Sequence, residues 1–274
     1  MTVDVDPPFS IKHSYVIEKG VTYLLDLFNK RAINATFFVP AIVALNFPEV
    51  IEEIVEKGHE IGCHGFNHSL SEIALSLDKK TRMIRDATEI IESITGQKPV
   101  GFRAPFFKAD RNCWIALKAN NYVYDSSCLG SPLYQRYNVK RNITGRPFYI
   151  HLYSGKDSSK KLIEIPVSVN LIVPFPLGGG WLRIFGFTWA KIGVKMNLIF
   201  RVPTIFYIHP KDVVAYEPRG LPWYYYRNAY NSLAMLDKII QYVRQNGAEF
   251  LAAYQLAKKF EDKHKLFILG NKHK

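Results

Sequence analysis

Two histidines four residues apart, His64 and His68, are the residues of this 274-residue chain whose type and spacing most directly suggest chemistry. They lie in the stretch Gly-His-Glu-Ile-Gly-Cys-His-Gly-Phe-Asn-His, at 58–68, after a short apolar run that predicts the end of a strand. Imidazole is the commonest metal ligand near neutral pH, and two histidines at this spacing can reach one ion from a single turn of chain. An isolated pair is weak evidence, so the prediction of a metal site depends on the rest of the sequence.

Further polar residues stand where other strands are expected to end. Asp4 and Asp6 lie two apart in the first apolar run, so their side chains share one face of a strand. Arg103, Asp125 and His209 each close a later apolar run. Singly, such residues are more often a helix cap, a surface ion pair or a core histidine. Parallel α/β folds, however, gather their chemistry at the carboxyl ends of strands, so together these residues predict an active site.

The elements that would position these residues alternate along the chain. Strands are expected at 2–5, 35–39, 59–63, 100–103, 122–124, 162–169 and 204–208. Helices are expected at 16–30, 50–57, 78–95, 112–120 and 227–245. The strands are too continuously apolar for a sheet with one face in water, which predicts a mainly parallel α/β sheet covered by helices, either a barrel or a doubly wound sheet. We expect a single domain over 1–274, with an irregular excursion at 130–161 and a basic tail at 262–274.

Composition and charge narrow the class of protein. Hydrophobic residues make up 48% of the chain and aromatic residues 14%, which is enough for a large core. The formal net charge is +12, from 36 Lys and Arg against 24 Asp and Glu, and it would favour anionic partners. Scattered surface lysines explain much of this charge. Because the sequence contains no aromatic-basic RNA motif, zinc finger or helix-turn-helix pattern, we expect no nucleic-acid partner.

The sequence also predicts the cellular compartment of the protein. Cys63, Cys113 and Cys128 form no CxxC pair or disulfide framework. The N-terminus has no signal-like apolar segment, and no run of about 18 uncharged apolar residues occurs. We therefore expect a cytoplasmic protein without a transmembrane segment. The basic, aromatic-rich stretch from Trp181 to Lys195 would also suit peripheral association with the inner membrane surface.

The ordered polar residues resemble the five motifs of the polysaccharide deacetylase family, carbohydrate esterase family 4. The motifs are Thr-Val-Asp-Val-Asp at 2–6, His-Gly-Phe-Asn-His at 64–68, Arg-Ala-Pro-Phe at 103–106, Asp125, and Ile-His at 208–209. The resemblance extends from the first strand to about residue 215. It implies a distorted (β/α) barrel, mainly parallel, with fewer than eight strands. It also implies a metal-dependent enzyme that removes N- or O-acetyl groups from sugars.

Carried over to this chain, the resemblance makes Asp6, His64 and His68 the ligands of a divalent metal ion, with zinc as the first choice. Three protein ligands and an open position are what a catalytic zinc requires. Asp4 becomes the general base, held ionised by Arg103. Because Val5 separates two aspartates that are adjacent in the commonest form of the motif, an exchange of the two aspartate roles stays open.

The same resemblance makes His209 the general acid, supported by Asp125. It also makes the backbone N–H of Phe106 a hydrogen-bond donor to the oxyanion. The run Gly-Gly-Gly-Trp-Leu-Arg at 178–183 is similar to a glycine-rich loop in one branch of the family. We assign substrate binding to Pro105, Phe107, Gly179, Gly180, Trp181 and Arg183. No tryptophan follows Asp125, so Phe106, Phe107, Trp181 and Trp223 are alternatives for the apolar contact to the acetyl methyl group.

These expectations favour a deacetylase for an acetylated carbohydrate, with N-acetyl preferred to O-acetyl. A free sugar, an oligosaccharide, a sugar nucleotide and a lipid-linked glycan all fit as substrates. One alternative is a metal-independent, allantoinase-like amidohydrolase on the same fold. The other is a catalytically silent sugar-binding protein.

Overall fold

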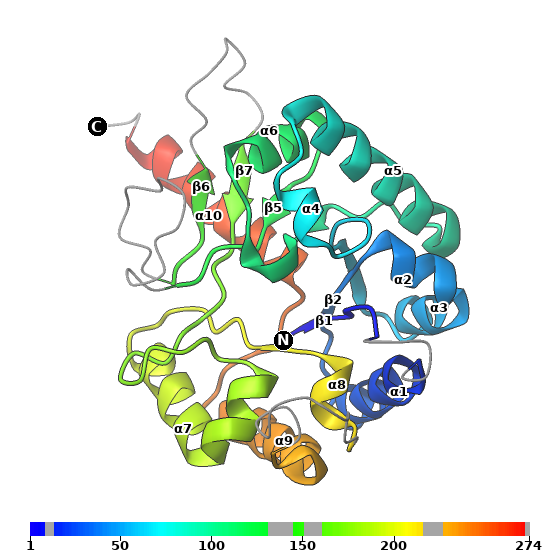
Figure 1. The fold of residues 1–274 in the computed structure, drawn as a ribbon. Helices are drawn as coiled ribbons and strands as arrows, with labels where there is room; N and C mark the ends of the chain where they lie inside the picture. Colours follow the sequence, from blue (N-terminus) through cyan, green and yellow to red (C-terminus); the bar gives the residue numbers. More distant parts are fainter. Residues whose placement is uncertain (9–13, 131–144, 151–160, 216–226, 272–274) are drawn as a thin grey trace.

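The computed structural model describes residues 1–8, 14–130, 145–150, 161–215 and 227–271 (Figure 1). In the first part of the chain the elements are β1 (Thr2–Asp4), α1 (Tyr15–Lys30), β2 (Thr36–Val39), α2 (Ala41–Asn46), α3 (Pro48–Glu56), β3 (Glu60–Cys63), α4 (Leu70–Ile73), α5 (Leu77–Thr95), β4 (Gly101–Phe102), the 3-10 turn η2 (Pro105–Phe107), α6 (Arg111–Ala119) and β5 (Tyr124–Asp125). The second part adds β6 (Phe148–Ile150), β7 (Leu162–Glu164), α7 (Gly179–Ile199), β8 (Tyr207–Ile208), α8 (Pro210–Val213), α9 (Ala229–Gln245) and α10 (Ala253–Asn271).

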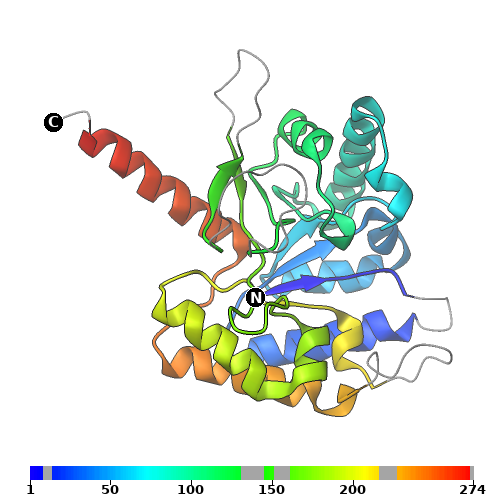
Figure 2. The ribbon, with the colours of Figure 1, turned by 60° about the vertical axis from the view of Figure 1, so that its left-hand side comes forward.

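The described strands form one eight-stranded sheet in the order β6-β7-β5-β4-β3-β2-β1-β8. Neighbours from β7 to β8 pair in parallel, and β6 pairs antiparallel with β7 at the edge. Beyond β7, the chain approaches the other edge of the sheet at β8. There the Ser168 N–H donates to the Ile205 carbonyl at 3.1 Å, and Gly178 pairs with Tyr207. The helices surround this sheet (Figure 2). Seven parallel strands in an incomplete (β/α) barrel confirm the predicted fold class.

Local sequence explains the elements that carry this barrel. All four residues of β2 are buried, as expected for an apolar strand covered on both faces. The helix α5 turns Ile84, Ala87 and Ile91 inward, at the three- and four-residue spacing of an amphipathic helix. It ends at Gly96, whose φ of +67° is the left-handed conformation that favours glycine at this position.

Because the strands are parallel, their carboxyl ends meet at one edge of the sheet. The strand β1 ends at Asp4, β3 ends at Cys63 just before His64, and β8 ends at Ile208 just before His209. The alternating strands and helices therefore bring residues from distant parts of the chain to the carboxyl edge of the sheet.

The second part of the chain departs from the predicted elements. The helix α7 was not expected, because its residues are rich in glycine and β-branched side chains; it is kinked at Gly186, which has a φ of +81°. The helices α2 and α10 were also missed, and α10 makes residues 262–271 of the predicted tail helical. The predicted excursion at 130–161 lies mostly outside the described residues, and its described part contains β6.

Strands from both ends of the chain share the sheet, since β8 pairs with β1. The assignment of a single domain over 1–274 stays a prediction. Among the helices of the described residues, none is both long and apolar enough to cross a membrane.

Candidate active site

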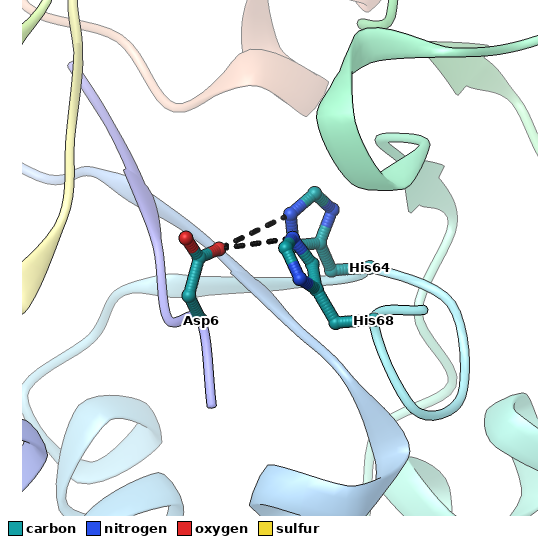
Figure 3. A group of neighbouring side chains, drawn as sticks. All are labelled: Asp6, His64 and His68. Atoms are coloured by element: carbon teal, nitrogen blue, oxygen red, sulfur yellow. Dashed lines mark ion pairs between the residues drawn. The ribbon is translucent and has the colours of Figure 1, made fainter. Parts of the chain in front are cut away.

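The three predicted metal ligands lie together at the carboxyl edge of the sheet, with both imidazole rings turned toward the Asp6 carboxylate (Figure 3). Asp6 Oδ1 is 3.6 Å from His64 Nε2 and 3.2 Å from His68 Nε2. One ligand atom from each residue lies within 4.8 Å of the other two. Two nitrogens and one carboxylate oxygen at these separations are a suitable donor set for a divalent ion.

The loop between the histidines depends on a buried glutamate. Glu72 accepts hydrogen bonds from the backbone N–H groups of Phe66, at 3.1 Å, and Asn67, at 2.5 Å. Gly65 has a φ of +79°, and a Cβ there would lie 2.7 Å from Glu72 Oε2. A glycine at this position therefore lets the loop turn tightly enough to bring His68 back beside His64.

The hydrogen bonds and charges around the three side chains suit a cation. His64 Nδ1 lies 2.7 Å from the Arg103 carbonyl oxygen, which can only accept, so Nδ1 carries the proton and Nε2 is left as a donor atom for a metal. Burial lowers the pKa of His68 to about 4. Burial alone would raise the pKa of Asp6, but the charges of Lys211, His209 and His68 and the contact with His64 together outweigh it and hold this pKa well below the usual range.

Asp6 also carries the clearest sign of an incomplete site. Its Oδ1 is buried and has no hydrogen-bond partner among the described residues. A buried carboxylate oxygen without a partner is unfavourable. The residues present therefore fit a bound divalent ion.

Asp4 and Arg103 form a fully buried ion pair, with Arg103 Nη1 at 2.5 Å from Asp4 Oδ1. The guanidinium is held by the Ser126 carbonyl oxygen at 3.0 Å and the Ser126 hydroxyl at 2.8 Å, and it lies over the Phe38 ring at 4.2 Å. Asp4 lines the same pocket as the three ligands. The predicted pairing of these two residues is therefore present, while the role of Asp4 as base stays a prediction.

His209 has a different partner from the one predicted. Its Nδ1 lies 3.0 Å from Asp212 Oδ2, and its backbone N–H donates to the same oxygen at 2.9 Å. Burial lowers the pKa of His209, but the carboxylates of Asp6 and Asp212 outweigh this and leave it raised. The prediction that Asp125 supports His209 is wrong, because Asp212 lies one turn further along α8 and was not recognised.

Asp125 belongs to a separate buried group behind Arg103. It accepts from Trp114 Nε1 at 2.9 Å and from the Ser127 hydroxyl at 2.6 Å. Glu164 lies beside it, and burial raises the pKa of both carboxyls. The Ser127 hydroxyl also accepts from the backbone N–H of Ala104, so this group fixes the chain next to Arg103.

The predicted substrate residues fall into two sets. Phe106 and Phe107 line a pocket of about 500 Å³ together with the three predicted metal ligands, and the Phe106 ring packs at a tilt against the His68 ring with centroids 4.5 Å apart. Pro105 is buried next to Gly65. The residues of this pocket, within the described chain, do not include Gly179, Gly180, Trp181 or Arg183, and Trp223 lies outside the described residues.

The glycine-rich loop instead supports His209 from behind. A Cβ at Gly179 would lie 2.4 Å from Asp212 Oδ2, so only glycine fits there. Arg183 Nη2 lies 3.6 Å from Asp212 Oδ1. Direct substrate contact by Gly179 and Arg183 is therefore not what the structure shows.

Sequence reasoning also missed Lys211 and Tyr207, which line the pocket. Lys211 Nζ lies 2.7 Å from Asp6 Oδ2, the oxygen that faces away from the two histidines, and His209 Nε2 lies 3.5 Å from the same oxygen. The only signal for Lys211 was its place two residues after His209, directly after Pro210.

Comparisons with known proteins concern the family and the fold of the chain. Residues 1–124 match the family model described as polysaccharide deacetylase, and residues 136–257 match a domain of unknown function, DUF3473. The chain is 28% identical to a peptidoglycan deacetylase of Helicobacter pylori over 270 residues, covering 89% of this chain and 84% of that protein.

Two solved structures share the fold. A putative polysaccharide deacetylase from Mycobacterium smegmatis superposes with a TM-score of 0.73 at 20% identity, covering 96% of this chain and 90% of that one. Puue Allantoinase superposes with a TM-score of 0.66 at 17% identity, covering 93% and 78%. Both confirm the incomplete barrel. Residues 1–124 therefore match the polysaccharide deacetylase family, and the curated relative that covers most of the chain is named a deacetylase, a hydrolase of carbon–nitrogen bonds.

Proposed function

We propose that this protein is a metal-dependent deacetylase that removes N-acetyl groups from a carbohydrate. The observation that carries the proposal is the cluster of Asp6, His64 and His68, whose donor atoms lie within 4.8 Å of one another around a buried carboxylate oxygen that has no hydrogen-bond partner in the described chain. Zinc is the ion that this ligand set suits best. A bound zinc would act as a Lewis acid that polarises the acetyl carbonyl and acidifies water.

Asp4 is suited to act as the base that takes a proton from the attacking water. It lines the pocket two residues before Asp6, and its pairing with Arg103 fixes the direction of the carboxylate. A base held in this way does not have to reorient during the reaction. The backbone N–H of Phe106 would donate to the carbonyl oxygen as negative charge develops on it.

His209 is suited to act as the acid that protonates the leaving amine nitrogen. Its Nδ1 is engaged by Asp212, so its Nε2 is the nitrogen that points toward Asp6 and the pocket. The carboxylate of Asp212 stabilises the imidazolium, as a raised pKa of His209 requires. An amide needs such an acid because an unprotonated amine is a poor leaving group.

The substrate class follows from the pocket and the relatives. Phe106 is 46% exposed on the pocket wall and offers an aromatic face to a sugar ring. The relative of Helicobacter pylori is named a peptidoglycan deacetylase. We therefore infer an N-acetylated glycan as the substrate.

The test combines metal content with product release. Purified protein would be analysed for zinc and incubated with N-acetylglucosamine oligomers and with peptidoglycan fragments, and free acetate would be measured. About one zinc per chain with acetate release would support the proposal. Protein that binds no metal on reconstitution and releases no acetate would overturn it.

A second candidate is a metal-independent amidohydrolase of the allantoinase-like kind. The observation that favours it is the Lys211 ammonium 2.7 Å from Asp6 Oδ2, because this group brings a positive charge to the site without a metal. Hydrolysis of allantoin or another amide that persists after chelation would select this candidate, whereas complete inhibition by a chelator would exclude it.

A further inference from the structure

One segment of the chain combines basic charge with exposed apolar side chains. Between Glu164 and Asp212 the sequence has no aspartate or glutamate, while Lys191, Lys195 and Arg201 are basic. The two other basic residues of the segment, Arg183 and Lys211, face Asp212 and Asp6 in the site. Seven of the thirteen exposed large hydrophobic side chains of the described residues fall in this segment: Leu171, Ile172, Val173, Phe185, Ile192, Ile199 and Phe200. Such a concentration indicates a binding surface, because exposed apolar residues on a monomer are normally scattered singly.

These side chains belong to one surface. The Asn170 side-chain amide donates to the Trp189 carbonyl oxygen at 2.9 Å, which holds the loop that carries Leu171 and Ile172 against the middle of α7. On the part of the helix that follows the kink at Gly186, the exposed positions 188, 192, 195 and 199 recur every three or four residues and so form one stripe. We call the exposed residues of this loop and stripe the α7 face.

Aromatic rings continue the α7 face toward the amino end of the helix. Phe175 stacks on Trp181 with centroids 4.2 Å apart, and Trp181 stacks on Phe185 at 5.8 Å. The opposite side of α7 packs on α9, and both views show α7 at the periphery of the molecule (Figures 1 and 2). The α7 face therefore points outward.

We propose that the α7 face binds the surface of an anionic lipid bilayer. Its apolar side chains, with Ile172 64% exposed, would enter the interface between headgroups and acyl chains. The exposed Lys195 of this face would bind anionic headgroups, and the segment between Glu164 and Asp212 contains no acidic residue that opposes it. A second copy of the chain is a poorer partner, since a two-fold contact would bring this cation against its own copy.

The position of the face relates it to the pocket. The helix α7 begins at Gly179, in contact with Asp212, which supports His209. A docked bilayer would therefore adjoin the side of the site that carries the proposed acid. Resting on the proposed function, this favours a lipid-linked saccharide as the substrate.

Vesicle flotation tests the proposal without any reaction. The full chain would be mixed with phosphatidylcholine vesicles with or without phosphatidylglycerol, at low and high salt. We expect flotation with the phosphatidylglycerol vesicles alone, and a decrease at high salt. Leu171→Glu and Ile172→Glu should each lower the partition coefficient by about tenfold, as burial of a large aliphatic side chain in the interface implies.

Leu45→Glu is the matched control, because Leu45 on α2 has the same 50% exposure as Leu171 and lies outside the α7 face. It should leave flotation unchanged. Absence of flotation, or an equal loss in Leu45→Glu, would overturn the proposal. A concentration-dependent dimer that Ile192→Glu disrupts, without flotation, would also overturn it and assign the face to self-association. If the unsubstituted protein floats with the vesicles but releases no acetate, the result would count against the proposed function and not against membrane binding.

Discussion

The two sides of the pocket are built in different ways. On the first side, His64 and Arg103 follow directly on β3 and β4, and Asp6 lies two residues after the end of β1, so the ends of the strands fix the side chains. On the other side, His209 is fixed by Asp212, and Asp212 in turn packs against Gly179 and lies near Arg183 at the start of α7. The first side depends on the sheet, and the second depends on a buried polar network. Substitutions on the first side should therefore abolish a function, while those on the second should reduce it by degrees.

The largest effect is expected for His64→Ala. Removing one of two imidazole ligands leaves two protein donors, which is fewer than a catalytic zinc site uses. Metal content should fall to background and acetate release should fall by about 10⁴-fold or more, in line with removal of a residue that acts as part of a unit. Elemental analysis and acetate release in the same preparations measure both.

His264→Ala provides the control, since His264 is exposed on α10 and contacts only aromatic rings among its described contacts. It should keep metal and activity. A His64→Ala protein that retains a full complement of zinc would show that the site lies elsewhere.

Asp4→Asn should separate chemistry from metal binding. The asparagine keeps a hydrogen-bond acceptor for Arg103 but loses the proton acceptor, so zinc should remain while turnover falls by about 10² to 10⁴-fold. Asp6→Asn should instead lower zinc content, because it removes the charged ligand. The reverse pattern would exchange the roles of the two aspartates.

Asp110→Asn is the matched control for this pair of variants. It weakens the Lys80–Asp110 ion pair of 2.9 Å, which also involves a buried cation but lies at the start of α6. Turnover should be unchanged, and a fall in thermal stability alone is expected.

The contrast between the two sides also explains what could be read from the sequence. Alternating apolar runs predicted the parallel sheet, and a polar residue directly after a strand has its position set by local chain direction, as at His64. The partner of His209 could not be found in this way. Asp125 also closes a strand, but its side chain accepts hydrogen bonds from Trp114 and Ser127. Tertiary packing determines these partners, and strand periodicity does not reveal them. The helix α7 was missed because its apolar, glycine-rich sequence lacks the polar face that marks a surface helix.

Asp212→Asn should produce a graded and selective loss. The asparagine can still bond His209 but no longer stabilises its imidazolium, so amide hydrolysis should slow by about 10²-fold. An activated acetate ester has a leaving group that needs no proton, and its hydrolysis should change much less. The measurement is the ratio of the two rates.

Asp125→Asn tests the alternative partner directly. It should affect both substrates equally, because Asp125 acts on the structure next to Arg103 and not on His209. A selective loss of amide hydrolysis in Asp125→Asn, with Asp212→Asn unaffected, would restore the pairing expected from the sequence.

The last prediction concerns acid stability, where two buried groups outside the pocket, His59 and Glu164, should act with opposite signs. His59 is buried behind β2, accepts the Ala35 N–H at Nδ1 at 3.1 Å, and has a pKa lowered to about 4 by burial. Below pH 6.5 the unfolded chain takes up a proton that the folded chain does not, so stability should fall between about pH 6.5 and 4, by on the order of 3 kcal/mol. Glu164 has a pKa raised by burial, so its stabilising contribution is present at low pH and is lost as the pH rises through its folded value. Urea unfolding across this range should show a reduced acid loss in His59→Asn and an enlarged one in Glu164→Gln. An unchanged acid loss in His59→Asn would show that other groups control it.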